Sequence, residues 1–415
     1  MIRAPLLSTE THDSRTMTTA ASTPAFDFDF DIAIVGAGPV GLALAGWLAR
    51  RSATRALSVA LVDARDPDAS ENDPRAIAVS QGSRMLLDTL GWPGDATPIE
   101  HIHVSQRGHF GRTLIERDEH DLAALGYVAR YGSIVRALAR AVRGTPARWL
   151  TSTSAHSPAQ DADGVTIALD TPQGARTLRA RVLVNAEGGL FDERKRKLTD
   201  SATNRDYGQT ALVGTVTVSA PRPRVAWERF TAEGPLALLP LGGPQQADYA
   251  LVWCCAPDVA QRRGALPDDA FLQELGATFG TRMGRFTRIV GRAAFPLGLA
   301  AAHTLVEGRI AIVGNAAQTL HPVAGQGLNL GLRDAHTLAE TLSEHGATPL
   351  ALATFNARRA LDRRMTIGAT DTLARLFTVD SRPLAMLRGA ALTALEFVPP
   401  LKTAIARQMM FGQRR

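Results

Sequence analysis

Residues 30–63 are the part of the sequence that most constrains the fold. Residues 30–35 (Phe-Asp-Ile-Ala-Ile-Val) form an apolar run typical of a buried strand, and Gly36-Ala-Gly38-Pro-Val-Gly41 follows at once. Residues 42–51 favour a helix, and a second apolar run at 58–62 ends in Asp63, 22 residues after Gly41. Strand, glycine turn, helix, strand and acid in this order predict a βαβ unit that binds a dinucleotide.

The three glycines and the acid have separate tasks in such a unit. Gly36 allows the tight turn, Gly38 lets the main chain approach a pyrophosphate, and Gly41 lets the helix pack on the strand. Asp63 can accept hydrogen bonds from the ribose hydroxyls of an adenosine. The structural alternative, a glycine turn that binds no nucleotide, does not account for the complete unit.

A second glycine-rich segment lies near the other end of the chain, at residues 308–334. It reads as an apolar strand (309–313), a glycine turn, a loop braced by Pro322, and a glycine-rich helix start. We expect the backbone N–H groups of residues 324–328 to be unpaired there, and a helix start carries partial positive charge. Gly325 and Gly327 would let a flat ligand approach the main chain. The segment therefore predicts a site for an anion or an electron-rich ring edge.

The amino-acid sequence of this segment resembles the second flavin-binding motif of the aromatic-ring flavoprotein monooxygenases. It is most similar to the ubiquinone-biosynthesis hydroxylases, in which Gly-Asn-Ala-Ala-Gln-Thr-Leu-His-Pro, here residues 314–322, replaces the commoner Gly-Asp-Ala-Ala-His. Residues 75–80, residues 230–240 and the pair Pro399-Pro400 also match that subgroup, and most closely its 2-polyprenyl-6-methoxyphenol hydroxylases. The resemblance covers about residues 29–400 and implies the para-hydroxybenzoate hydroxylase fold.

The resemblance also implies which residues contact FAD. On the adenylate and pyrophosphate side these are Gly36, Gly38, Gly41, Asp63 and Arg75, and Asn315 lies near the ribityl–phosphate region. The isoalloxazine would be lined by Pro322, Gly325, Gln326, Gly327, Leu328 and Asn329. Two positions depart from the family pattern. Glu187 replaces the Asp of an Asp-Gly turn, and the usual flavin contact at the start of the next helix falls near Tyr131, with Arg130 beside it.

The chemistry implied is hydroxylation of a polyprenylated phenol with O2, for which the cofactor carries the oxygen and the protein holds the ring, stabilises charge and excludes water. Only one complete nucleotide fingerprint is present, so NADPH or NADH is expected to bind transiently. His321 is a candidate base for phenol ionisation. Its alternative role is that of a loop histidine that braces Pro322 or faces solvent. Phe295 and Pro296 could wall a substrate cavity or belong to the ordinary core.

We expect the α/β class: a Rossmann-like FAD-binding domain interleaved with a mainly antiparallel substrate-binding sheet, and a helical C-terminal region. A chain of 415 residues exceeds one typical core. The expected divisions are a disordered extension (1–28), the FAD-binding domain (29–98, 129–200 and 301–370), the sheet domain (99–128 and 201–300) and C-terminal helices (371–415). Within them we expect helices at 80–90, 133–143 and 268–279, and strands at 210–218, 226–230, 234–239 and 249–255.

Composition narrows the cellular setting. The only cysteines, Cys254 and Cys255, are adjacent in an apolar run. Neighbours in a strand point to opposite faces, so we expect no disulfide and a reducing cytoplasm. No cysteine or histidine spacing suggests a metal site, and no motif suggests nucleic-acid binding. Residues 1–28 lack the apolar core of a secretory signal, and no uncharged apolar run is long enough for a membrane span.

The C-terminal region is basic. From residue 358 onward there are 11 Lys and Arg against 4 Asp and Glu, an excess of +7, whereas the chain as a whole carries +6. Leu384, Leu387, Ala391, Leu395 and Val398 follow at helical spacing. The stripe either touches an anionic membrane peripherally or packs on the protein's own core. A different class of function is a non-catalytic flavoprotein that scaffolds a ubiquinone-biosynthesis complex, to which Glu187 and Asn315 could point.

Overall fold

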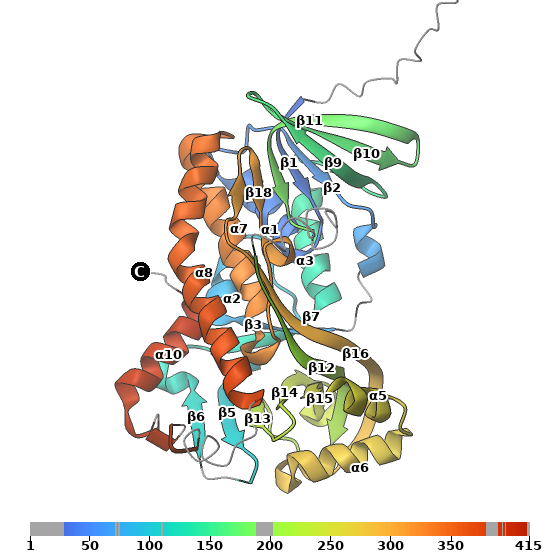
Figure 1. The fold of residues 1–415 in the computed structure, drawn as a ribbon, viewed down its shortest axis with the longest axis vertical. Coiled ribbons are helices and arrows are strands. Elements are labelled where there is room, and N and C mark those ends of the chain that lie inside the picture. The colour runs from blue at the N-terminus through green and yellow to red at the C-terminus, as the bar shows by residue number, and fades with distance from the viewer. Residues whose placement is uncertain are drawn as a thin grey trace, which may run out of the picture.

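The computed structural model describes residues 29–187 except 71, 72, 74, 109 and 110, residues 202–378, and residues 389–412 except 392 and 395. The expected extension at 1–28 lies outside the described residues, as do Leu384, Leu387 and Leu395 of the C-terminal stripe. The described chain builds two large sheets, one small sheet between them, and long helices that run along their side (Figure 1).

The first sheet contains the strands of both sequence motifs. Its strand order is β17-β18-β11-β1-β2-β8, and a hairpin of β9 and β10 extends β11. β1 pairs in parallel with β11 and β2, as the βαβ motif predicts. The strands are β1 (Asp29–Val35), β2 (Val59–Val62), β8 (Arg148–Leu150), β9 (Ser154–Gln160), β10 (Val165–Thr171), β11 (Gly174–Asn185), β17 (Val306–Glu307) and β18 (Ile310–Ile312). Helices α1 (Pro39–Arg50), α3 (Tyr131–Arg143) and α7 (Gln326–His345) pack on this sheet and form the largest apolar core with it.

The second sheet has the order β19-β16-β12-β15-β14-β13-β5-β6 and is mainly antiparallel. Its strands are β5 (His101–Gln106), β6 (Arg112–Glu116), β12 (Ala202–Val218), β13 (Val225–Phe230), β14 (Pro235–Gly242), β15 (Asp248–Cys255), β16 (Phe286–Ala302) and β19 (Gln318–Thr319). Helices α5 (Pro257–Gly264) and α6 (Asp268–Phe279) lie beside it, and α6 has the expected bounds. Cys255 belongs to the core on the α6 side, whereas Cys254 packs with Ala211 and Leu297, so the two free thiols point to opposite faces.

Three features differ from the sequence expectation. β16 is a 17-residue strand with exposed side chains along much of its length, so it shows no simple apolar alternation. β12 begins at Ala202 instead of residue 210, because irregularities in the pairing between Asp206 and Gln209 interrupt its pattern. The third sheet, β3 (Ala76–Ser80), β7 (Gly126–Arg130) and β4 (Thr97–Ile99), is made of segments too short to recognise from sequence.

The remaining helices link the parts. α2 (Gln81–Leu87) follows β3 and is shorter than the expected helix at 80–90. α8 (Pro349–Thr378) runs along α7 from the first sheet toward the second (Figure 1). α10 (Pro399–Phe411) lies beside β5 and β6 at the far end of the molecule (Figure 1).

Candidate flavin and substrate site

The glycine turn between β1 and α1 is closed too tightly for side chains at two positions. Gly36 has φ +105°, and a Cβ there would lie 2.9 Å from the backbone nitrogen of Glu187. A Cβ at Gly41 would lie 1.9 Å from the carbonyl oxygen of Gly36. At Gly38 the nearest atom of the described residues is the Tyr131 hydroxyl oxygen, at 3.3 Å. Gly36 and Gly41 therefore fix the turn, whereas Gly38 leaves its main chain approachable.

Asp63 is buried at the end of β2, directly beside this turn. Its Oδ2 accepts a hydrogen bond from the Ala37 N–H at 2.6 Å, and its Oδ1 accepts one from the Arg65 N–H at 2.7 Å. Glu187 lies close by, and burial together with the charge of Asp63 raises the pKa of Glu187 above its usual value. The turn thus meets two carboxyl groups, and Asp63 occupies the position from which an acidic residue accepts hydrogen bonds from ribose hydroxyls.

Arg75 lies at the rim of the same turn. Its guanidinium pairs with Asp73 at 2.7 Å and stacks over the Tyr131 ring, 4.6 Å from the ring centroid. Since the Tyr131 hydroxyl is the atom that faces Gly38, these side chains form one wall of the pyrophosphate turn. Arg130, the N-cap residue of α3, sits opposite Ala76 in the adjoining sheet.

The second motif meets the first through glycine contacts. Gly314, with φ +63°, follows β18 by one residue and opens the short turn η5 (Gly314–Ala316). A Cβ at Gly331 of α7 would lie 2.9 Å from the Cα of Gly314, and a Cβ at Gly314 would lie 3.1 Å from Val40 of α1. Gly314 and Gly331 are therefore packed backbone to backbone, and both lie against the Val40 side chain of the first motif. Asn315 is left exposed at the surface of the turn.

The start of α7 follows the turn η6 (Val323–Gly325), where Gly325 has φ +59°. The expectation of five unpaired N–H groups was wrong for Gly325, whose N–H donates to the carbonyl of Pro322 at 3.0 Å because the chain makes a 3-10 turn before the helix. A Cβ at Gly325 would lie 3.0 Å from that of Ala78 in β3, whereas a Cβ at Gly327 would meet no atom within 4 Å among the described residues. Gly327 therefore provides the open approach to the helix start.

Three residues expected to line the isoalloxazine use their side chains elsewhere. The Asn329 amide donates to the carbonyls of Gly325 and Ala78, and its oxygen accepts from the Ser80 N–H. Gln326 donates to the carbonyl of Met409 in α10, and Leu328 packs on the main core. These side chains hold α7 against β3 and α10. Contact with a flat ring is then left to the main chain and to Gly327.

His321 is buried in the loop before η6. Its Nδ1 accepts a hydrogen bond from the Val323 N–H at 3.2 Å, and its Nε2 lies 3.3 Å from Oε1 of Gln209. The Tyr207 ring meets it edge-on, and burial lowers the pKa of His321 to about 4. A neutral imidazole with both nitrogens engaged favours the bracing role over that of a catalytic base.

Glu228 is the ionisable residue that sequence reasoning missed. It lies between Ala226 and Phe230 on β13, and Phe230 packs against Val323 of η6. Alternation therefore places the Glu228 carboxyl on the sheet face that meets residues 314–325, here called the flavin loop. Burial raises the pKa of Glu228 to about 7. A glutamate within the apolar alternation of a strand could have signalled this position, although a solvent-facing residue gives the same pattern.

Comparison with known proteins identifies the family. Residues 29–364 match the family model described as an FAD binding domain. The chain is 34% identical over 404 residues to ubiquinone hydroxylase UbiL of Rhodospirillum rubrum, covering 92% of this chain and 89% of that protein. It is 28% identical over 395 residues to the 3-demethoxyubiquinol 3-hydroxylase of Escherichia coli, covering 90% and 96%. The chain belongs to the FAD-dependent hydroxylases of ubiquinone biosynthesis.

A solved structure shows the same fold. The p-nitrophenol 4-monooxygenase PnpA from Pseudomonas putida superposes with a TM-score of 0.73 at 17% identity, covering 93% of this chain and 100% of that one. The α/β fold expected from the sequence is confirmed. As a member of its family, the chain is a flavoprotein monooxygenase with FAD as its cofactor. NAD(P)H is the reductant typical of this family.

The residues present fit FAD. The open main chain at Gly38 and Gly327, together with the buried carboxylate of Asp63, would hold the pyrophosphate, the ring and the ribose respectively. When bound, FAD supplies the oxygen-transfer chemistry, and the protein's part is to position the substrate ring and to exclude water from it. In the described part of the chain, no group of three or more His, Cys, Asp or Glu side chains could hold a metal ion.

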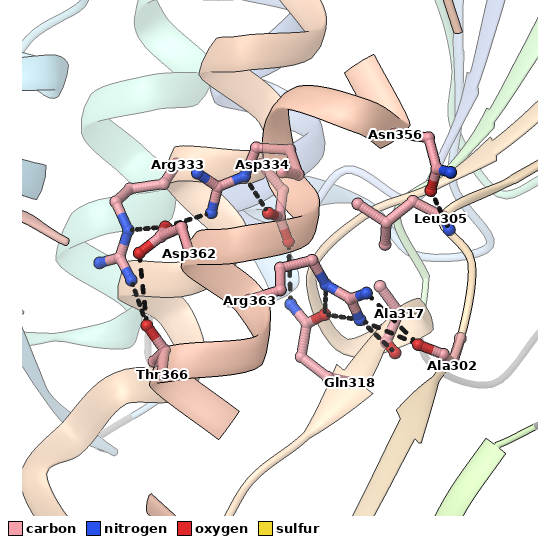
Figure 2. Close-up of polar contacts among 11 residues, drawn as sticks. Ala302, Leu305, Ala317, Gln318, Arg333, Asp334, Asn356, Asp362, Arg363 and Thr366 are labelled. Atoms are coloured by element: carbon pink, nitrogen blue, oxygen red, sulfur yellow. Dashed lines mark hydrogen bonds and ion pairs between the residues drawn. The ribbon is translucent and has the colours of Figure 1, made fainter. Parts of the chain in front are cut away.

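A buried charge network fixes the flavin loop to α8 (Figure 2). Arg359 bridges Asp334 and Asp362 at 2.7 and 2.6 Å, and Arg333 pairs with Asp362 at 2.9 Å. Arg363 extends the network by donating to Oε1 of Gln318 and to the carbonyls of Ala302 and Ala317. The loop that carries Asn315 and His321 is therefore held by α8 through charged contacts.

The same contacts account for part of the positive charge of the C-terminal region. Arg359 and Arg363 are buried in the network and Arg358 pairs with Glu344, so these three cations of the +7 excess are committed to the protein's own carboxylates and carbonyls. Among the described residues, no helix is long and apolar enough to cross a membrane.

Proposed function

We propose that this chain hydroxylates the ring of a polyprenylated phenol, 2-polyprenyl-6-methoxyphenol, during ubiquinone biosynthesis. One oxygen atom of O2 enters the ring, the other leaves as water, and NADPH or NADH supplies the two electrons. The observation that carries the proposal is the contact of Phe230 with Val323, which brings the sheet face of Glu228 to the loop that leads to the open helix start at Gly327.

We assign FAD contacts to the residues that the sequence singled out, with changed roles for some of them. Gly38, Asp63 and Arg75 border the adenylate and pyrophosphate side, and Asn315 remains accessible at the ribityl–phosphate turn. Pro322, Gly325 and Gly327 shape the path to the ring, whereas Gln326, Leu328 and Asn329 support it from behind. The interleaved domain boundaries given above belong to the same proposal.

Glu228 is the residue we propose for phenol activation. A carboxylate with a pKa near neutrality can accept the phenolic proton and so make the ring more electron-rich. Phe295 of β16 is 43% exposed and lies opposite Ala211, so an apolar ring could also rest on that part of the sheet. His321 would act through its position by holding the loop.

The ring carbon that the enzyme hydroxylates requires a separate test. The names of the E. coli and Rhodospirillum relatives refer to hydroxylation steps of ubiquinone biosynthesis, so a paralogous enzyme acting at another ring carbon is the second candidate. Deleting the gene and identifying the accumulated quinone precursor decides between them. Accumulation of the 2-polyprenyl-6-methoxyphenol supports our proposal, and any other ring intermediate, or none, contradicts it.

A non-catalytic scaffold is tested on the purified protein. An enzyme is expected to be yellow, to bleach on addition of NAD(P)H with a phenolic substrate, and to recover its colour in air. Bound flavin that NAD(P)H cannot reduce, even with the phenol present, would favour a scaffold in a ubiquinone-biosynthesis complex. Peripheral contact with a membrane is also part of the proposal, because a polyprenyl chain partitions into the bilayer.

A further inference from the structure

A positively charged row crosses the end of the second sheet. In the strand register, Ser105 of β5 lies opposite Arg229 of β13 and opposite Arg112 of β6, so the three share one face. Arg282 of the turn η4 (Thr281–Met283) joins them at a cavity of about 740 Å³, which Glu396 and Phe397 also line. Phe230, the neighbour of Arg229, packs on the flavin loop. The cavity therefore opens on the sheet face away from the flavin.

The charges of this cavity are not neutralised within the described residues. Arg112, Arg229 and Arg282 make no ion pair there, and the buried Nε of Arg229 has no hydrogen-bond partner. The one carboxylate of the lining, Glu396, accepts from the Leu114 N–H and lies 3.7 Å from Lys402. Burial and the three arginines lower the pKa of the adjacent His103 to about 4. An anion bound in the cavity would neutralise these arginines and accept their hydrogen bonds.

Large apolar side chains are exposed on Phe397, which lines the same cavity, and on the residues that follow it. Phe397 is 79% exposed, Val398 45%, Leu401 50% and Ile405 40%. Leu401 and Ile405 lie one turn apart on α10, whose inward residues Ala406 and Met410 pack on Leu125. α10 is therefore anchored to the protein and still presents a second apolar face to the outside. Val398, the last residue of the stripe expected at 384–398, belongs to this surface.

We infer that the arginine-lined cavity and the outward face of α10 together form a docking site for an anionic bilayer. The cavity takes the phosphate of an acidic phospholipid headgroup, and the four apolar side chains enter the boundary between headgroups and acyl chains. A soluble phosphate ligand would fill the cavity but leave the protruding residues uncovered. The inference deepens the proposed function, since docking would bring the enzyme to a substrate held in the bilayer.

Flotation of the full-length, FAD-loaded enzyme with substrate-free vesicles tests docking separately from activity. Vesicles of phosphatidylcholine with phosphatidylglycerol are expected to carry the protein, and pure phosphatidylcholine vesicles much less of it. Because Arg112 and Arg282 have exposed side chains, Arg112→Gln and Arg282→Gln should fold. Each is expected to weaken binding about fivefold, the equivalent of ~1 kcal/mol for a basic residue near an anionic surface.

Substituting the apolar face tests the second half of the site. The pair Phe397→Ser and Leu401→Ser should weaken binding at least about tenfold, since it removes two inserted side chains. Matched controls lie elsewhere: Arg55→Gln removes an exposed arginine, and Leu350→Ser a leucine that is 61% exposed. Both controls should bind vesicles like the unchanged protein. Flavin content and turnover of a short-chain phenol report folding and the proposed activity independently.

Four outcomes would overturn the inference. The first is failure of the unchanged protein to bind phosphatidylglycerol vesicles, and the second is equal binding by all variants and controls. The third is a raised KM for NADPH in the arginine variants with unchanged vesicle binding, which would make the cavity a soluble nucleotide site. The fourth is a change in sedimentation velocity of the apolar variant without any effect on vesicle binding, which would make the surface a contact between two copies of the chain.

Discussion

The Nε2 atom of His321 lies 3.3 Å from Oε1 of Gln209, and this contact joins the flavin loop to the second sheet. Because Nδ1 of His321 accepts the Val323 N–H, its Nε2 carries the proton and donates to Gln209. Gln209 in turn donates to the carbonyl of Glu233, in the turn after β13. The strand that carries Glu228 is thus connected, through two side chains, to the loop that begins α7.

A double-mutant cycle measures this connection. His321→Ala and Gln209→Ala are each expected to weaken FAD binding, because the loop before Gly325 loses its support. The double mutant should lose less free energy of FAD binding than the sum of the two single losses. The expected difference is about 1 kcal/mol, as for a buried hydrogen bond. The FAD dissociation constants of the four proteins give the coupling, and strict additivity would show that the contact does not position the loop.

Gly38→Val is expected to abolish FAD retention. The nearest described atom to the new Cβ is the Tyr131 hydroxyl oxygen at 3.3 Å, so the side chain would fill the approach to the pyrophosphate and disturb the wall formed with Arg75. Gly144→Val is the matched control, since no described atom lies within 4 Å of its Cβ position. The ratio of flavin to protein absorbance reports the result. A folded Gly38→Val protein with normal flavin content would remove this turn from the site.

Gly327→Leu should spare the fold and impair hydroxylation. The position of its Cβ is open, so the leucine projects into the space through which a ring would approach the helix start. Gly368→Leu in α8 makes the same change at another open helical position and should have little effect on turnover. Hydroxylation of a short-chain phenol by the two FAD-loaded variants is the measurement. Equal rates would exclude the open approach at Gly327 as part of the site.

The parts that sequence predicted are those fixed by local backbone chemistry. The turn at Gly36 and Gly41 has almost no alternative conformation, and the bounds of α6 follow from its apolar spacing and flanking proline and glycine. What sequence could not provide depends on long-range packing. The Asn329 side chain is hydrogen-bonded to β3, where its oxygen accepts from the N–H of Ser80, 249 residues earlier in the chain. The sequence around Asn329 gives no sign of this contact. Similarly, the environment of Glu228 exists only after β13 has met the flavin loop.

Removing one partner of the buried charge network is expected to be costly. Although burial alone would raise the pKa of Asp362, Arg333 and Arg359 hold it below its usual value. Asp362→Ala leaves both cations buried without that carboxylate, at a cost of about 3 kcal/mol or more. Glu344→Ala breaks the neighbouring exposed pair with Arg358 and should change stability little. Urea unfolding midpoints compare the two, and similar midpoints would show that the network does not stabilise the loop.

Glu228 gives the enzyme a dependence on pH that can be followed in stability and in rate. Burial raises the pKa of Glu228 from 4.5 to about 7, so the folded protein favours the protonated carboxyl. The stabilising effect of that proton is complete below 4.5, the pKa of this carboxyl in the unfolded chain. It is lost as the pH rises through about 7, the pKa in the folded protein. Glu228→Gln, which cannot ionise, should therefore gain stability relative to the unchanged protein as the pH rises.

In catalysis the ionised form is the one required, so the rate should change in the opposite direction. Hydroxylation by the unchanged enzyme is expected to rise with pH through about 7, and Glu228→Gln should lose that rise together with about a hundredfold of the rate. A more acidic phenol, which ionises without a base, should restore much of the rate in the variant. Flavin content must remain normal for the comparison to hold. Identical pH–rate profiles for the two proteins would exclude Glu228 as the group that accepts the phenolic proton.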